Sequence, residues 1–185
     1  HTYDSINKVT INSIYDLASI TKPTAGAFAL MYLYKDSLID INSPLSNYLK
    51  YFKNTRVGDT KVIDYLQHIS GIRSWIPFHE TTKKDNGDFK RKTLSFIYKK
   101  KYNIKLSDSL YLYKKYKKEI YKQIKNTNFI EADTVLYSGL FYYLIPEIVK
   151  NITNDSFDSY LEKIYNRLEL KTMVFNPLKK FKLDQ

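Results

Sequence analysis

Two apolar runs, residues 28–34 and 140–149, decide what kind of molecule this chain can form. Lys35 ends the first run, and Pro146 and Glu147 interrupt the second. Both fall short of the roughly 20 apolar residues that a helix needs to cross a bilayer. The chain must therefore bury these runs in a protein core, and the sequence predicts a soluble protein without a membrane span.

The chain is long enough for a single domain with such a core. It has 185 residues, of which 43% are hydrophobic and 26% charged, ordinary values for a soluble globular protein. The composition also excludes several kinds of site. Cysteine is absent, which excludes disulfides, thiolate metal sites and thiol nucleophiles. The five glycines leave little material for a glycine-rich phosphate loop.

The net charge of +11 comes from one segment. Residues 83–125 contain 15 of the 30 Lys and Arg but only 4 of the 19 Asp and Glu, which accounts for the whole net charge. Tyr113, Tyr116 and Tyr121 lie among these lysines, a composition that suits single-stranded nucleic acid or an anionic cell-wall polymer. The tyrosines fall at helical spacing, however, and Arg91 is the only arginine within residues 83–125, whereas base readout favours arginine. The pattern therefore favours a buried tyrosine stripe with a solvated lysine face over nucleic-acid binding.

Three regions differ in character along the chain. They are a nearly neutral region at residues 1–78, a Lys/Tyr-rich region at 79–130 that we expect to be a helical insertion, and a balanced region at 131–185. Apolar periodicity and capping residues predict a mostly helical chain, with a strand or extended lead-in at 10–16. The expected helices cover residues 19–34 with Pro23 in the first turn, 61–68 with Thr60 as N-cap and Gly71 as the stop, 113–125, 137–151 with a bend at Pro146, and a last helix through Arg167 with Asp155 or Ser156 as N-cap.

The first candidate for chemistry is the Ser19-x-x-Lys22 spacing at the start of the apolar helix. Residues three apart lie on the same face of a helix, so Lys22 Nζ can reach Ser19 Oγ. A desolvated lysine has a lowered pKa and can take the serine proton, and the positive end of the helix favours a developing oxyanion. The same spacing occurs at Ser5-x-x-Lys8, in a polar lead-in. Since about two such matches are expected by chance, it is the buried helix that singles out Ser19.

Three segments, in a fixed order, carry a resemblance to a known family. They are residues 15–22 (YDLASITK) with 36–40 (DSLID), residues 60–72 (TKVIDYLQHISGI), and residues 137–140 (YSGL) with 168–173 (LELKTM). They resemble the nucleophile region, the LLTHTSG helix and turn, and the YSN…LGEI…PLGM region of the class C β-lactamase-like serine hydrolases. That family includes penicillin-binding proteins, D-alanyl-D-alanine peptidases and related esterases. His68 falls on a position of the second motif that is structural in the family.

The resemblance implies a fold, a reaction and residue roles. The fold is the α/β architecture of β-lactamases and transpeptidases, with Ser19 as the acylated nucleophile and Lys22 as its proton partner. Tyr137 is implied as a second general base between nucleophile and leaving group, with Lys22 stabilising its phenolate. Gly139 occupies the substrate-binding position from which the family's Asn or Asp orients the substrate amide. The implied reaction hydrolyses an amide or ester of cell-wall peptides through an acyl-enzyme, without a cofactor.

Two departures from the family pattern bear on activity. Gly139 replaces the Asn or Asp two positions after the tyrosine. No glycine follows Gly139, so the Lys-Thr-Gly or His-x-Gly motif, whose strand supplies half of the oxyanion hole, cannot follow either. We therefore expect the chain to be the mostly helical N-terminal half of the domain, without the later sheet strands and incomplete or inactive on its own. The alternatives are a catalytically silent binding module of the same fold and a basic interaction protein.

A narrower likeness concerns the middle of the chain. Residues 75–78 (WIPF), 108–111 (DSLY) and 121–124 (YKQI) are similar to a serine-hydrolase module that some Gram-negative bacteria carry behind a family 3 glycoside hydrolase domain. This likeness implies a fused glycoside hydrolase domain, which would account for a chain that begins at His1, and a place in the periplasm or cell envelope. The expected partner is a small-molecule, peptide or ester substrate. His1 and His79 have no carboxylate at metal-ligand spacing, so no metal site is expected.

Overall fold

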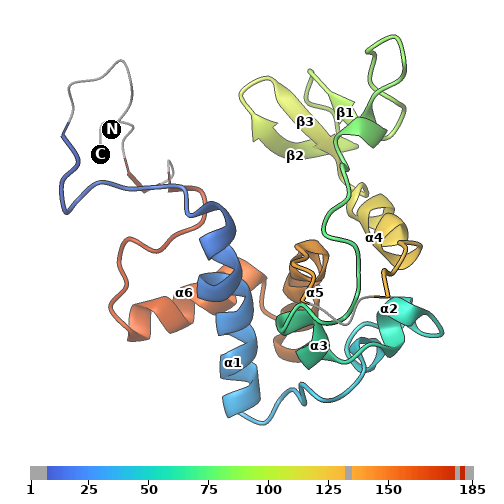
Figure 1. Ribbon diagram of the computed structural model, residues 1–185. Helices are drawn as coiled ribbons and strands as arrows, with labels where there is room; N and C mark the ends of the chain where they lie inside the picture. Colours follow the sequence, from blue (N-terminus) through green and yellow to red (C-terminus); the bar gives the residue numbers. More distant parts are fainter. Residues whose placement is uncertain (1–7, 132–134, 178–179, 182–185) are drawn as a thin grey trace. The chain divides into compact units, whose positions relative to one another are not determined.

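The computed structural model describes residues 8–131, 135–177 and 180–181 (Figure 1). They fall into two compact units. Unit 1 is drawn from His1–Ile39 and Val149–Gln185, and unit 2 from Asp40–Ile148. Among the described residues, no helix is both long and apolar enough to cross a membrane.

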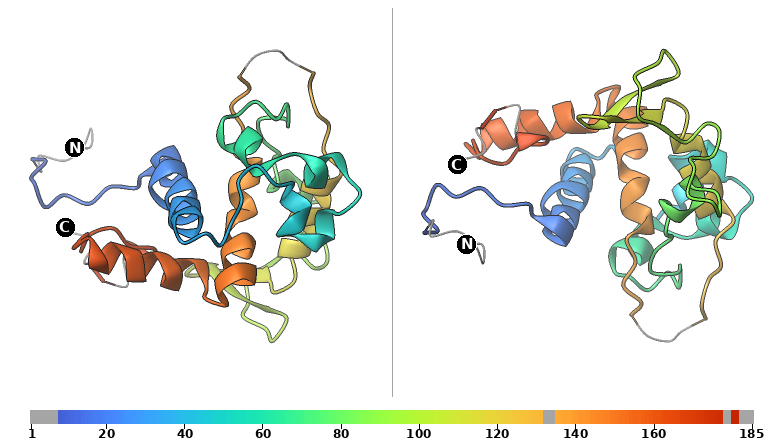
Figure 2. Two further views of the ribbon diagram at one scale, coloured as in Figure 1. Left: turned by 90° about the horizontal axis from the view of Figure 1, so that it is seen from below. Right: turned by 90° about the horizontal axis from the view of Figure 1, so that it is seen from above.

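Unit 1 is built around α1 (Phe28–Lys35) and α6 (Phe157–Arg167), which both views of Figure 2 show close together. Each helix buries three apolar side chains on one face. The buried residues are Ala29, Leu30 and Leu33 on α1, and Leu161, Ile164 and Tyr165 on α6. The predicted last helix is confirmed with its cap, because the Ser156 hydroxyl accepts the backbone N–H of Ser159 at 3.3 Å.

The predicted helix over residues 19–34 forms, but its first half is not α-helical. A 3₁₀ turn at Ala18–Ile20 leads into a π-helical segment at Lys22–Ala27, and α1 follows. Pro23 explains the break, since an α-helical carbonyl at Ser19 would need the N–H of residue 23, which proline lacks. The N–H of Phe28 instead bonds to the carbonyl of Pro23, five residues back.

Unit 2 has its core where short helices meet. These are α2 (Arg56–Asp59), α3 (Val62–Leu66) and the first turn of α5 (Ile145–Thr153). The ring of Tyr65 stacks on Phe141 with centroids 4.9 Å apart, and the Tyr65 hydroxyl donates to the carbonyl of Val57 at 2.7 Å. Further fully buried side chains of this core are Leu45, Phe52, Ile72, Ile124, Leu140, Leu144 and Ile148.

α3 is shorter than predicted and begins at a different cap. It covers Val62–Leu66 rather than 61–68, and its N-cap is Lys61 rather than Thr60. The Thr60 hydroxyl is not available for capping because it donates to the carbonyl of Arg56 at 2.7 Å, at the end of α2. The capping prediction was wrong because the preceding short helix α2 was not recognised.

The turn that ends α3 has His68, rather than Gly71, in the left-handed position. His68 has a φ of 58°, the left-handed conformation that usually requires glycine. The N–H groups of His68 and Ile69 reach back to the carbonyls of Tyr65 and Asp64 at 3.2 and 2.9 Å. These are the two hydrogen bonds of a Schellman motif, with a histidine in the glycine position.

The Lys/Tyr-rich region is only partly helical, which corrects the expectation of a helical insertion at 79–130. β1 (Leu94–Ser95), β3 (Leu110–Tyr113) and β2 (Tyr102–Ser107) pair antiparallel in that order. α4 (Lys117–Lys125) confirms the helical end of the region. Tyr113 belongs to β3 and not to this helix, because it pairs with Tyr102 of β2. Alternating Tyr, Leu and Ile with polar residues has a period of two, and this pattern outweighs the helical spacing of the tyrosines.

The remaining predicted elements form with changed ends. Residues 137–151 divide into a 3₁₀ turn at Leu140–Tyr143 and α5, which begins at Ile145. Pro146 therefore lies in the first turn of α5, where its missing N–H has no helical partner to lose, and it starts the helix instead of bending it. Residues 10–16 contain no strand; the segment begins with a turn, in which the N–H of Ser13 donates to the carbonyl of Thr10 at 3.1 Å.

Candidate active site

Ser19 and Lys22 meet at the start of the helical segment that leads into α1. Lys22 Nζ donates a hydrogen bond to Ser19 Oγ at 2.9 Å. Ser19 is exposed and Lys22 is half-buried, so the pair lies at the surface of unit 1. The contact follows from the spacing, because residues three apart share a helix face.

Ala18 positions Ser19 in a strained turn. Its φ is 43°, a conformation that an alanine adopts at a cost of about 1–2 kcal/mol. The Asp16 carboxylate accepts the N–H of Ala18 at 2.8 Å and holds this turn in place. Strained residues are concentrated at functional sites, and no sequence pattern signals this one.

Tyr165 of α6 supports the π-helical segment behind Ser19. Its hydroxyl donates to the carbonyl of Thr24 at 2.7 Å, and its ring stacks on Phe28 with centroids 6.1 Å apart. The Thr24 hydroxyl donates in turn to the carbonyl of Ile20 at 2.7 Å. Both bonds add a side-chain hydroxyl donor to a backbone carbonyl of the irregular helical segment. Nothing in the sequence singles out Tyr165 among 18 tyrosines.

Unit 1 also contains a cavity of about 860 Å³ on another side of this helical segment. Most of its wall comes from residues 11–17 and 172–177, with Thr21, Thr24 and Ala25 contributed by the helical segment. Neither Ser19 nor Lys22 lines it. The hydroxyl–lysine pair and the cavity are therefore separate features of unit 1.

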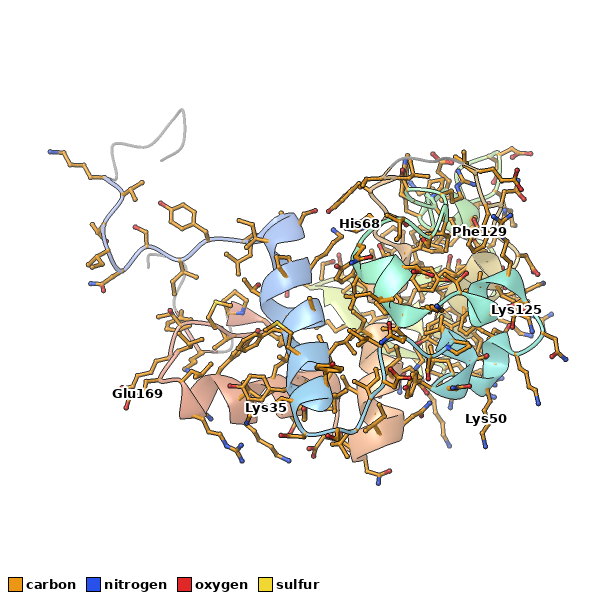
Figure 3. All side chains as sticks on the ribbon, turned by 60° about the horizontal axis from the view of Figure 1, so that its bottom comes forward. Lys35, Lys50, His68, Lys125, Phe129 and Glu169 are labelled. Atoms are coloured by element: carbon orange, nitrogen blue, oxygen red, sulfur yellow. The ribbon has the colours of Figure 1, made fainter. Side chains whose placement is uncertain are left out.

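Tyr137 and Gly139 lie in unit 2, in a segment that His68 holds on both sides of Tyr137. The carbonyl of His68 accepts the N–H of Leu136 at 2.8 Å, and its Nδ1 accepts the N–H of Ser138 at 3.2 Å. The rings of His68 and Tyr137 are tilted against each other with centroids 4.8 Å apart. Figure 3 labels His68 just beyond α3. Tyr137 remains 51% exposed, so it is fixed at its backbone and open to solvent at its side chain.

Ser138 and Gly139 attach the same segment to the chain after Gly71. The buried Ser138 hydroxyl donates to the carbonyl of Arg73 at 2.8 Å and accepts the N–H of Leu140 at 3.2 Å. The N–H of Gly139 donates to the carbonyl of Ser74 at 3.0 Å. Gly139 has a φ of −90°, which any residue adopts. A side chain at this position is therefore compatible with the backbone.

The structure thus brings together two of the four predicted site residues, Ser19 and Lys22, in unit 1. Tyr137 and Gly139, two positions apart in the sequence, lie in unit 2. His68 has a role that the sequence analysis did not predict, since it holds the backbone on both sides of Tyr137. The His-x-Ser-Gly pattern, which marks His68 as structural, is the sequence feature that points to this role. Among the residues that the structure describes, no group of three His, Asp or Glu side chains is placed to hold a metal ion.

A family model described as Beta-lactamase matches residues 2–183. The chain belongs to the beta-lactamase family. This confirms the family expected from the three motif segments. It also places the segments that carry Ser19 and Tyr137 in one family domain rather than in two unrelated ones.

Curated relatives of this beta-lactamase family chain carry the name "Putative D-alanyl-D-alanine carboxypeptidase". The protein of Salmonella gallinarum is 31% identical over 181 residues, which cover 94% of this chain and 36% of the relative. The protein of Salmonella schwarzengrund is 32% identical over 183 residues, with the same shares covered. The chain therefore spans about a third of the length of these relatives.

A solved structure confirms the fold. The class C beta-lactamase from Rhodobacter sphaeroides is similar with a TM-score of 0.53 and 16% sequence identity. The similarity covers 83% of this chain and 34% of that protein. The chain has the β-lactamase/transpeptidase-like fold, in a helix-rich portion with one small sheet of three strands among its described residues.

Proposed function

We propose that the chain is the nucleophile-bearing part of a serine hydrolase that forms an acyl-enzyme on Ser19 and cleaves an amide or ester of cell-wall peptides. The observation that carries the proposal is the 2.9 Å hydrogen bond between Lys22 Nζ and Ser19 Oγ at the start of a partly buried helix. Family membership and the carboxypeptidase names of the relatives support the reaction class. A cell-wall peptide substrate would be met in the bacterial periplasm or cell envelope, which is the location we propose.

In the proposed reaction, Ser19 Oγ attacks the carbonyl carbon of the substrate while the neutral form of Lys22 takes the hydroxyl proton. The carbonyl oxygen becomes an oxyanion, which the positive end of the helical segment stabilises. When the tetrahedral intermediate collapses, the leaving amine or alcohol takes up this proton, a transfer in which the family resemblance assigns Tyr137 the role of second general base. Water then adds to the acyl carbon, gives its proton to the same groups, and releases the carboxylic acid and the free Ser19 hydroxyl.

The complete activity is proposed for a longer protein. The chain spans 36% of the length of its carboxypeptidase-named relatives, and it holds no glycine after Gly139 from which the family's third motif could be built. Loss of one oxyanion-hole donor costs about 10²–10³ in rate, so we expect slow acylation and slower turnover from these 185 residues.

One observation favours the alternative of a catalytically silent binding module. Gly139 stands where the family's Asn or Asp orients the substrate amide, and no Tyr-x-Asn occurs in the chain. A module of this kind would keep the fold and the peptide-binding surface but would not acylate Ser19. The two functions differ in a single measurable property, the reactivity of the Ser19 hydroxyl.

The experiment is intact-mass measurement after incubation with a fluorescent penicillin and, separately, with a fluorophosphonate. Ser19→Ala is the test variant, and Ser5→Ala is the matched control because Ser5-x-x-Lys8 has the same spacing. An adduct that is lost in Ser19→Ala and kept in Ser5→Ala supports the hydrolase, and Lys22→Gln then slows its formation by about 10²–10⁴-fold. Failure of both reagents to label this chain, and also a longer chain that carries the third motif, supports the silent module instead.

A further inference from the structure

The small sheet of unit 2 exposes apolar side chains to solvent. Among its strands and the turn after β1, five large apolar residues are between 43% and 66% exposed. They are Phe96, Ile97, Tyr98, Ile104 and Leu106. We refer to these five residues as the sheet patch. Exposed apolar side chains in such a cluster mark a surface that meets another apolar medium.

The strand pairing sorts the sheet into two faces. Leu94, Leu112 and Ile104 are aligned partners across β1, β3 and β2, so one row of the sheet is aliphatic on a single face. The next row, Ser95, Tyr111 and Lys105, lies on the opposite face, where the ring of Tyr98 packs edge-on to Tyr111 with centroids 5.7 Å apart. An aliphatic face on a sheet usually indicates that something covers it.

Nothing in the described chain buries this sheet. Each residue from 94 to 115 is half-buried or exposed. Figure 1 shows the sheet at one end of unit 2, beyond α4, with open space on the far side. The residues described in the structure therefore leave the sheet patch exposed, with Ile104 on one face of the sheet and Tyr98 beside Tyr111 on the other, while Leu94 and Leu112 of the aliphatic row are half-buried.

The charge around the sheet patch is strongly positive. Residues 90–118 contain eleven Lys and Arg and a single acidic residue, Asp108. Lys105 Nζ pairs with the Asp108 carboxylate at 2.9 Å, and this ion pair neutralises the one negative charge. Lys99, Lys100 and Lys101 follow the apolar residues 96–98 directly, in the turn between β1 and β2. Three apolar residues are thus followed by three lysines in the connection between β1 and β2.

We propose that the sheet patch docks on the surface of an anionic lipid bilayer. Lysines at such a surface reach the lipid phosphates, while aromatic and aliphatic side chains enter the boundary between headgroups and acyl chains. A soluble polyanion would use the lysines but leave the sheet patch in water. A second copy of the chain would bring two clusters of equal charge together, which is unfavourable. The inference does not depend on the chemistry of Ser19, and it concerns surface contact rather than a membrane-spanning segment.

The first test measures binding of the 185-residue chain to vesicles of phosphatidylcholine with and without phosphatidylglycerol. We expect binding to the anionic vesicles only. Lys99→Gln/Lys100→Gln weakens it by about 25-fold, since each lysine near an anionic surface contributes about fivefold, whereas Lys50→Gln/Lys53→Gln makes the same charge change elsewhere in unit 2 and leaves binding within about twofold. The proposal is overturned if the two double variants bind anionic vesicles with equal affinity, or if the parent chain binds neutral vesicles as well as anionic ones.

The apolar part is tested with side chains of equal exposure. Phe96→Ser/Ile97→Ser lowers vesicle affinity by about tenfold or more through lost apolar burial. The control, Met31→Ser/Tyr34→Ser, removes residues that are 62% and 54% exposed on α1 and leaves affinity unchanged. If the serine pair at 96 and 97 binds as well as the parent chain, and the parent binds dextran sulfate as tightly as vesicles, the surface is a polyanion site and the proposal fails.

A direct readout avoids any dependence on lost binding. The chain has no cysteine, so Ile97→Cys and Met31→Cys each accept a single environment-sensitive dye. On anionic vesicles the dye at position 97 shifts to the blue and gains intensity, because it leaves water for the headgroup boundary, while the dye at position 31 keeps its spectrum in water. An unchanged spectrum at position 97 under conditions where the chain pellets with the vesicles contradicts the proposal.

Discussion

Nδ1 of His68 accepts the backbone N–H of Ser138 at 3.2 Å, which ties the end of α3 to the segment that carries Tyr137. Together with the bond from Leu136 to the His68 carbonyl, it fixes the backbone on both sides of Tyr137. His68 does this from a left-handed backbone conformation, with a φ of 58°. One residue therefore ends a helix and positions a candidate catalytic tyrosine.

His68 variants separate these two tasks. His68→Gly restores an unstrained left-handed position but removes the acceptor, so we expect a loss of about 1 kcal/mol in the free energy of unfolding. His68→Ala removes the acceptor and also places a Cβ in the left-handed conformation, for a loss of about 2–3 kcal/mol. Urea unfolding measures both. Equal stability of the two variants would show that the helix end does not need the left-handed residue.

Ala18 holds the turn before Ser19 with a φ of 43°. Ala18→Gly relieves this strain, so we expect stability to stay constant or to rise by up to about 1 kcal/mol. Ala18→Val adds a β-branched side chain in the same conformation and lowers stability by about 2 kcal/mol or more. Thermal unfolding should give melting temperatures that fall from Ala18→Gly through the parent to Ala18→Val. The reverse order is inconsistent with a left-handed Ala18.

Much of the fold follows from the sequence where periodicity and capping agree. The last helix forms as predicted, and of its two N-cap candidates, Asp155 and Ser156, it is Ser156 whose hydroxyl caps α6. The contact between Ser19 and Lys22 follows from helical spacing alone. The family assignment rested on three ordered motifs and is confirmed.

The failures share a physical cause, namely competition between neighbouring patterns. Thr60 has the chemistry of an N-cap, but it terminates α2 instead. Tyr113 falls at helical spacing from Tyr116 and Tyr121, but it pairs with Tyr102 of β2 and so belongs to β3. Tyr165 acts through a hydrogen bond 141 residues along the chain, and no local pattern can report a contact of that range.

Gly71 combines a positive φ of +73° with close packing, because a Cβ built on it would lie 2.5 Å from the carbonyl oxygen of Ile130. Gly71→Ala therefore lowers the free energy of unfolding by about 1 kcal/mol through the strained backbone conformation. The new Cβ also pushes the Ile130 carbonyl away, which adds to the loss because the N–H of the same residue donates to the Gly71 carbonyl at 2.7 Å. Gly87 is the matched control, since its φ is +86° and a Cβ there meets nothing within 4 Å. Chemical denaturation is expected to give Gly71→Ala a clearly lower free energy of unfolding than Gly87→Ala.

Buried phenols limit stability at alkaline pH. Burial raises the pKa of Tyr65, Tyr121 and Tyr165 above the ordinary value. The unfolded chain then loses these protons first as pH rises above about 10, so this share of the stability is present below that pH and is lost above it. The share of the phenolate absorbance that comes from these three side chains should rise together with loss of the circular dichroism signal. Tyr121→Phe should reduce the slope of the free energy of unfolding against pH by the contribution of one proton. An unchanged slope contradicts the assignment of this loss to Tyr121.

Gly139 offers a test of why the chain departs from its family. Its φ of −90° suits any residue, and its N–H bond to the Ser74 carbonyl does not depend on a side chain. Gly139→Asn is therefore expected to fold with a free energy of unfolding within about 0.5 kcal/mol of the parent.

If Ser19 forms an acyl-enzyme, the amide that the family places here raises the rate of penicillin acylation by about tenfold, as one added hydrogen bond to the transition state does. Gly139→Ala fills the same space without the amide and controls for packing. Faster acylation in the Asn variant alone shows that the missing side chain limits the reaction, whereas equal rates in all three chains show that position 139 does not touch the substrate.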